Sequence, residues 1–298
     1  MSAIVNTAVF FLIVFVVGIL GVIGIDHALR QIMSAEPTIE TYGSYDPTKR
    51  ETLYFLLGPS GVKGSKVFPN LRHFLRFHGD VKEATYDPKR FKIATVVDGV
   101  LGHTAGYKRV VFVGLSVGYP VGFLTAEQLL ALNTGQKVFL AGIDPVGTAA
   151  TLKMGGSKVV KYALKMVAPG PILNLLSPLA GKLSFKPADI TTIHPRNEWE
   201  LRELWHSYRT YPLSGWRDEL LAVHEFPGFH PLPGVKTGLV QSTNDTVVDS
   251  DKMYAEAQQI DPNLPRQRVH GTGHVAVLDE PDLFEAALER LLLDLALI

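Results

Sequence analysis

The chain has 298 residues, of which 46% are hydrophobic, and its 29 basic and 29 acidic side chains balance. This length and apolar content allow a large buried core, which excludes a disordered chain. The chain has no excess of basic charge, so its composition does not indicate binding to nucleic acid. The absence of Cys excludes disulfides, thiolate metal sites and a Cys nucleophile.

The N-terminus predicts a membrane anchor. Residues 8–25 (AVFFLIVFVVGILGVIGI) are apolar or glycine throughout. Roughly 20 apolar residues cross the hydrocarbon core of a bilayer, whereas a secretory signal has a shorter apolar run after a basic segment. We therefore expect a single-pass transmembrane helix over residues 1–25, in contact with the membrane through residues 3–25.

The segment that follows predicts a tether. Residues 26–50 are polar and contain Pro37 and Pro47. Basic residues near the C-terminal side of the anchor favour a cytoplasmic position for the rest of the chain; these are Arg30, Lys49 and Arg50.

From residue 51 onward, strand patterns alternate with helix patterns. Strands are expected at 53–57, 81–86, 108–114, 137–144, 235–243 and 266–271, and helices at 67–77, 90–105, 119–132, from about 250 and from 281. This alternation predicts an α/β fold with a mostly parallel central sheet and helices on both faces.

One range interrupts the alternation. Residues 147–233 contain no strand-like run but several apolar helical stretches and many prolines, which predicts an insertion between two core segments, 51–146 and 234–298. Lysines recur around apolar residues in its first part, at 153, 158, 161 and 165, and a solvated helix face explains them better than a surface for anionic lipid.

The sequence LLGPSGVKGS (56–65) partly matches a phosphate-binding loop. Counting from Gly58, the required Gly is Lys63 and the required Lys is Gly64, so the order is reversed. We therefore expect no nucleotide site there.

The sequence GLSVG (114–118) fits the pattern G-x-S-x-G. A Ser at a sharp turn between a strand and a helix leaves no room for side chains two residues away on either side, which Gly114 and Gly118 satisfy. A buried strand precedes the motif and a helix pattern follows it. Ser116 is therefore the candidate nucleophile.

A Ser nucleophile needs a base and an acid that orients the base. Asp245 follows one late strand, and His274 lies in a Gly-rich turn after another, with Gly273 before it. The rival acids are Asp144, for which a turn role is favoured, and Asp249 and Asp251, which fit a helix N-cap and first turn; the rival base is His270.

The chain contains a glycine-flanked Ser turn at residues 114–118, called the elbow, then an acid after a strand and a late histidine. In this order the three features resemble those of the α/β-hydrolase superfamily, in particular its serine esterases and lipases. The resemblance covers nearly the whole chain from residue 50 and implies that 147–233 is a cap or lid. It also implies an oxyanion hole formed by the N–H of Val117 and an N–H from the loop after 53–57. Pro59 has no N–H, so the second donor is Ser60, with Gly61 as the next choice.

The predicted function is a membrane-anchored serine hydrolase that cleaves carboxylic esters of low polarity, without a cofactor. No metal-binding motif such as H-E-x-x-H is present in the sequence. The alternatives are an acyltransferase or amidase with the same triad, and a catalytically silent scaffold that binds a partner.

Overall fold

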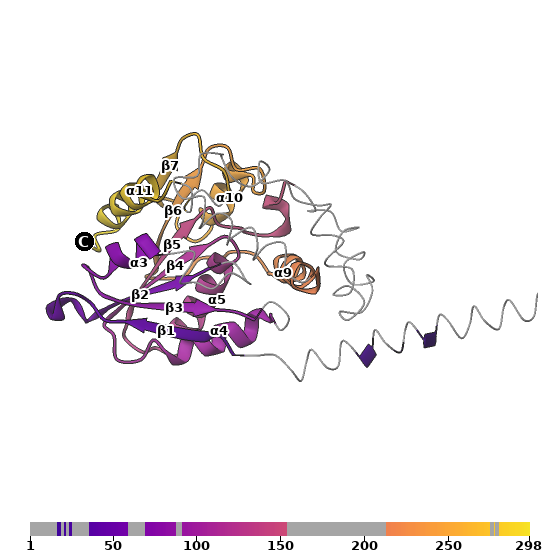
Figure 1. The fold of residues 1–298 in the computed structure, drawn as a ribbon, viewed down its shortest axis with the longest axis horizontal. Coiled ribbons are helices and arrows are strands. Elements are labelled where there is room, and N and C mark those ends of the chain that lie inside the picture. Colours follow the sequence, from indigo (N-terminus) through magenta and orange to yellow (C-terminus); the bar gives the residue numbers. More distant parts are fainter. Residues whose placement is uncertain are drawn as a thin grey trace, which may run out of the picture.

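A single mixed sheet forms the centre of the molecule (Figure 1). The computed structural model describes residues 36–58, 69–87, 91–153, 213–274, 277 and 280–298, together with residues 17, 18, 21, 24 and 25. The described residues form seven strands in the order β1-β3-β2-β4-β5-β6-β7. The strands are β1 (Thr38–Tyr42), β2 (Thr52–Leu57), β3 (Asp80–Thr85), β4 (Arg109–Leu115), β5 (Lys137–Ile143), β6 (Lys236–Ser242) and β7 (Arg266–Val269).

All neighbouring strands are parallel except β1, which runs antiparallel to β3. All six residues of β2 are buried, as are six of the seven in β4. Continuous apolar strands of this kind are typical of a parallel sheet covered on both faces. The predicted α/β class with a mostly parallel sheet is therefore confirmed.

Helices cover both faces of the sheet. The helices are α3 (Pro69–Leu75), α4 (Ile93–Gly102), α5 (Gly118–Ala131), α9 (Leu213–Glu225), α10 (Ser250–Ala257) and α11 (Pro281–Asp294), with short 3₁₀ turns η1 (Pro47–Lys49) and η2 (Ala149–Thr151). Apolar residues of α3 and α11 pack in one cluster, and those of α4, α5, α9 and α10 pack in the other.

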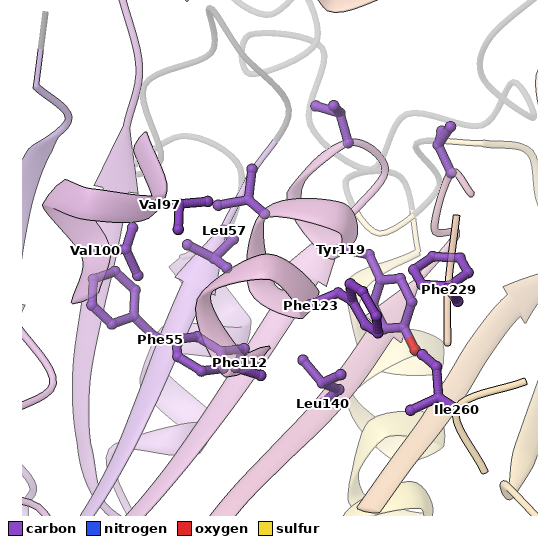
Figure 2. Packing of buried hydrophobic residues seen from close by; sticks show 14 of the residues in the cluster. Phe55, Leu57, Val97, Val100, Phe112, Tyr119, Phe123, Leu140, Phe229 and Ile260 are labelled. Carbon is purple, nitrogen blue, oxygen red and sulfur yellow. The ribbon is translucent and has the colours of Figure 1, made fainter. Parts of the chain in front are cut away.

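Alternate residues of each strand supply these two clusters. In β2, Phe55 and Leu57 belong to the cluster with α4 and α5, whereas Tyr54 and Leu56 belong to the cluster with α3 and α11. Figure 2 shows the first cluster, in which Phe123 lies close to Phe112 and Leu140 on the sheet and to Phe229. Burial of each such side chain stabilises the fold by about 1.5–3 kcal/mol.

The prediction of a tether over 26–50 is wrong for part of that range. Residues 38–42 (TIETY) form β1, which pairs with β3 along its whole length. None of the five residues of β1 is buried, because the strand lies at the edge of the sheet. A polar edge strand lacks the apolar run on which the prediction relied.

The boundaries predicted for the insertion, 147–233, also need correction. Near its C-terminal end, Phe226 and Phe229 are buried and contact Phe123 of α5 edge to face. Near its start, η2 contacts α10. Both ends therefore belong to the core, and residues 154–212 lie outside the described residues.

Within the part of the chain that the structure describes, no helix combines the length and apolar character needed to cross a membrane. The predicted anchor lies almost wholly outside that part.

Candidate active site

Three of the predicted site residues, Ser116, Asp245 and His274, meet at the carboxyl ends of the parallel strands. Ser116 follows β4, Asp245 follows β6 and His274 follows β7, and these three strands run in the same direction. The carboxyl ends of parallel strands lie at a common edge, where loops bring functional side chains together. Residues separated by up to 158 positions in the chain therefore become neighbours.

Ser116 occupies a strained turn between β4 and α5. Its φ is +54°, in the left-handed region that residues other than glycine rarely adopt. The turn is held from both sides, since Ser116 N donates to Ile143 O at 3.2 Å and Val146 N donates to Ser116 O at 3.1 Å. Ser116 as a residue is partly exposed.

The two flanking glycines are required by close backbone contacts. A Cβ atom on Gly118 would lie 2.0 Å from Leu57 O, and one on Gly114 would lie 2.5 Å from the Cα of Tyr119. Both distances are far below a van der Waals contact. The predicted reason for glycine at these positions is thus confirmed.

Ser116, His274 and Asp245 form a continuous hydrogen-bonded chain. Ser116 Oγ lies 3.0 Å from His274 Nε2, and His274 Nδ1 lies 2.8 Å from Asp245 Oδ2. With the proton on Nδ1, the ring donates to the carboxylate, and Nε2 is free to accept the proton of the hydroxyl group. The arrangement can generate a nucleophilic oxygen at Ser116.

Asp245 is buried and fully engaged by hydrogen bonds. The backbone N–H groups of Val247 and Val248 both donate to its Oδ1 at 2.8 Å, and Oδ2 faces His274. Burial favours the neutral acid, but the charge and hydrogen bond of His274, together with the two backbone donors, outweigh burial and lower the pKa of Asp245. The acid therefore remains ionised.

His274 lies in a turn that is tied to the end of β6. Asn244 N donates to Thr272 O at 3.0 Å, and Gly271 N donates to Thr243 Oγ1 at 3.1 Å. Burial alone would lower the pKa of His274, but the charge and hydrogen bond of Asp245 and the charge of Asp144 raise it above the ordinary value. A stronger base at this position favours removal of the Ser116 proton.

A second buried carboxylate lies beside the predicted triad. Asp144 follows β5 with a φ of +39°, and its carboxylate accepts hydrogen bonds from Ser242 N at 2.6 Å and Ser242 Oγ at 2.7 Å. Burial raises the pKa of Asp144 to about 7, with a further contribution from Asp245 and an opposing one from His274. The predicted turn role agrees with this backbone, but the sequence did not predict a second buried carboxyl group next to the base.

The rival residues lie outside the hydrogen-bonded chain. Asp249 caps α10 and accepts from Lys252 N at 3.2 Å, as its N-cap interpretation requires. Asp251 lies in the first turn of α10 and pairs with Arg266 and Arg268. His270 is exposed to solvent.

Only part of the predicted oxyanion hole can be described. Val117 is buried at the N-terminus of α5, directly after Ser116. Ser60 and the remainder of the loop at 59–68 lie outside the described residues. The loop does begin beside the elbow, because a Cβ atom on Gly118 would lie only 3.1 Å from Gly58 O.

Among the described residues, no group of three or more His, Asp or Glu side chains is arranged to hold a metal ion.

Comparison with solved structures identifies the same fold in several hydrolases. A thermophilic esterase from Thermogutta terrifontis shares 16% identity at a TM-score of 0.61, over 87% of this chain and 93% of the esterase. A membrane phospholipase A described as a bacterial virulence factor shares 15% identity at a TM-score of 0.58, over 98% and 99% of the two chains. A carboxylesterase from the thaumarchaeon Nitrososphaera gargenis shares 13% identity at a TM-score of 0.57, over 87% and 95%. At such identities the likeness concerns the fold alone.

No curated protein sequence gives a significant match. The sequence model of the Alpha/beta hydrolase family, in contrast, matches residues 56–287, which include the elbow, Asp245 and His274. The match extends over more than half of the chain, and the predicted resemblance is confirmed. The chain therefore belongs to the Alpha/beta hydrolase family.

Proposed function

We propose that this protein is a serine hydrolase that cleaves carboxylic esters, with Ser116 as nucleophile, His274 as general base and Asp245 as orienting acid. The observation that carries the proposal is the hydrogen-bonded chain of 3.0 Å from Ser116 to His274 and 2.8 Å from His274 to Asp245. The strained backbone of Ser116 supports it, since strain of this kind is found at functional sites.

In the proposed reaction, Ser116 Oγ attacks the acyl carbon while His274 Nε2 takes the hydroxyl proton. The tetrahedral intermediate collapses, the bond to the alcohol oxygen breaks, and His274 returns the proton to that oxygen. Water then attacks the acyl-enzyme with the same help from His274 and releases the carboxylic acid and free Ser116. Asp245 keeps its charge throughout and stabilises the protonated imidazole.

The negative oxygen of the intermediate requires hydrogen-bond donors. We assign Val117 N–H as one donor, because it follows the nucleophile at the N-terminus of α5. Ser60 N–H is assigned as the other. The position of Gly58 O beside Gly118 supports this assignment, since the loop that contains Ser60 leaves the sheet at that point.

We further propose that the N-terminal apolar segment anchors the protein in a membrane, with the hydrolase domain on the cytoplasmic side. The sequence of residues 8–25 supports the anchor, and Arg30 supports the orientation. A membrane phospholipase A is among the solved proteins of the same fold.

The way in which the chain joins the sheet supports a substrate drawn from the membrane. Because β1 is antiparallel, its first residue, Thr38, pairs with Thr85 at the carboxyl end of β3. The carboxyl ends of β3, β2 and β4 lie on the same side of the sheet, and Ser116 follows β4 directly. Pro37 is buried and fixes this point against α4, since a Cβ atom on Gly99 would lie 2.5 Å from the Pro37 ring.

The connection between the apolar segment and this point is short. The residues from 26 to 36 can span roughly 40 Å when fully extended. The anchor therefore keeps the catalytic edge of the sheet near the bilayer. An ester with a long acyl chain, such as a glyceride or a lysolipid, is the substrate class that this placement favours.

The preference for apolar esters can be tested with a series of p-nitrophenyl esters from acetyl to long-chain acyl groups, using the full chain in detergent. Each buried methylene contributes about 0.8 kcal/mol, so we expect kcat/KM to rise at least about tenfold between the acetyl and the octanoyl ester. Ser116→Ala corrects for background hydrolysis. A flat profile, with and without lipid vesicles, would contradict a lipid-like substrate.

Membrane attachment gives a separate prediction. We expect the full chain to stay with the membrane fraction after alkaline carbonate extraction and a variant that lacks residues 2–25 to appear in the supernatant, because the apolar segment supplies the attachment. Labelling of Ser116 by a fluorophosphonate in both forms controls for folding. Recovery of the full chain in the supernatant would refute the anchor, and digestion of the domain by protease added to intact cells would refute the orientation.

A further inference from the structure

The segment that leads from β5 toward residue 154 is bound firmly to the core. Gly147 N donates to Thr151 Oγ1 at 3.2 Å, and Thr148 N donates to Glu256 Oε2 of α10 at 2.8 Å. Thr148 Oγ1 donates to the second oxygen of the same carboxylate. Both oxygens of Glu256 therefore hold the start of η2.

The residues after η2 run along the turn that contains Asp245. Asp249 N donates to Thr151 O at 2.7 Å, and Lys153 N donates to Val247 O at 2.9 Å. Between these two bonds, Leu152 forms an antiparallel bridge with Val248. The described chain 151–153 is thus paired with 247–249, next to the predicted catalytic acid.

Lys153 makes a second contact with this turn through its side chain. Its ammonium group donates to the backbone carbonyl oxygen of Asp245 at 2.5 Å. A hydrogen bond from a charged donor is about twice as strong as one from a neutral donor. Backbone and side chain of one residue therefore hold both ends of the turn from Asp245 to Val247.

The orientation of the Asp245 carboxylate depends on this turn. Oδ1 accepts the N–H groups of Val247 and Val248, and Oδ2 faces His274, so rotation of the turn would move both oxygens. The carboxylate in turn fixes the ring of His274 with its proton on Nδ1. The lysine does not touch the imidazole or the nucleophile in this chain of contacts.

We propose that Lys153 is a positioning residue of the active site: its ammonium group holds the Asp245 turn, so that the carboxylate stays aligned with His274 Nδ1. The proposal rests on the proposed function in assigning Asp245 as the orienting acid. It gives Lys153, one of the lysines that the sequence pattern places in the predicted insertion, a role within the catalytic apparatus.

The test compares Lys153→Met with Lys153→Arg and with a matched control in the full chain. Lys252→Met is the control, because Lys252 is exposed like Lys153 but pairs with the N-cap residue Asp249 at 3.2 Å and not with the carbonyl of Asp245. We expect Lys153→Met to lower kcat about tenfold with KM changed less than twofold, since small displacements of catalytic groups cost rate rather than binding. Lys153→Arg restores most of the rate, and Lys252→Met keeps the wild-type rate.

A second readout reports the position of Asp245 independently of turnover. The proton between His274 Nδ1 and Asp245 gives a ¹H NMR signal far downfield, which we expect to be weakened or shifted in Lys153→Met and retained in Lys252→Met. Wild-type kcat together with an unchanged signal in Lys153→Met would overturn the proposal. This holds even if the melting temperature of the variant fell, because a lower melting temperature alone would indicate a structural role. If the wild-type protein hydrolysed no ester, the proposed function would fail, and the signal would still decide whether Lys153 positions Asp245.

Discussion

Replacement of Ser116 by Ala is expected to lower ester hydrolysis by at least about 10³-fold. The variant has no oxygen to attack the acyl carbon, and the remaining groups supply only binding and oxyanion stabilisation. The fold should persist, because Ala and Ser meet the same steric cost at a φ of +54° and Ser116 Oγ bonds only to His274 among the described residues. The measurement is turnover of a long-chain p-nitrophenyl ester by the full chain in detergent, with labelling by a fluorophosphonate in parallel.

Ser250→Ala is the matched control for this variant. Ser250 follows the N-cap of α10, and its hydroxyl donates to Ser242 O at 3.2 Å without touching His274. We expect wild-type turnover and full labelling of Ser116 in this control. Equal rates for Ser116→Ala and the wild type would refute the nucleophile and leave a binding role for the hydrolase fold.

Replacement of Asp245 by Asn is expected to lower kcat by about 10²–10⁴-fold with little change in KM. An amide NH₂ group facing Nδ1 would force the proton of His274 onto Nε2, which could then no longer accept the Ser116 proton. The lost charge also removes the main stabilisation of protonated His274. Steady-state kinetics over the same ester series provides the measurement.

Asp144→Asn is the companion variant, since Asp144 is buried on the same edge of the sheet. An amide can still accept from Ser242 N and donate to Ser242 Oγ, so the turn should be preserved. The charged groups that act on His274 are Asp245 and Asp144, and both raise its pKa. Because the pKa of Asp144 is about 7, its charge is present mainly at and above neutral pH. Removal of this charge lowers the pKa of His274 there, so we expect a small shift of the acid limb of the profile of kcat/KM against pH to lower pH.

These two variants distinguish the acids. We expect Asp144→Asn to retain kcat within about tenfold of the wild type, because Asp245 continues to orient the base. A loss of activity in Asp144→Asn as large as in Asp245→Asn would contradict the assignment of Asp245 as the orienting acid. An unshifted acid limb would show that the charge of Asp144 does not reach His274.

Much of the architecture could be predicted from local pattern. The strands β2, β4, β5 and β6 are apolar runs in the sequence, because burial on both faces restricts which residues they contain. In α11 the buried residues recur at helical spacing, which makes its pattern readable. The elbow was also predictable, since its close backbone contacts require glycine at positions 114 and 118.

Elements whose position depends on contacts with distant parts of the chain could not be predicted from local pattern. The edge strand β1 has no buried residue, and its pairing with β3 is decided by backbone hydrogen bonds that any sequence can form. The sequence pattern places residues 226 and 229 in an insertion outside the core, whereas in the structure Phe226 and Phe229 pack in the core against Phe123. Contacts between distant segments leave no periodic signal in either segment.

For the candidate site, too, some features could be predicted from local sequence and others depend on the tertiary structure. The sequence by itself determined that a Ser at a glycine-flanked turn, an Asp and a His follow strands in that order, because strained turns and strand ends have local signatures. Only the tertiary structure decided that His274 faces Asp245, that Asp144 is buried beside them and that Lys153 holds the Asp245 turn. Alignment, burial and charge depend on how the carboxyl ends of four strands meet in space, and this arrangement is fixed by the packing of the whole sheet.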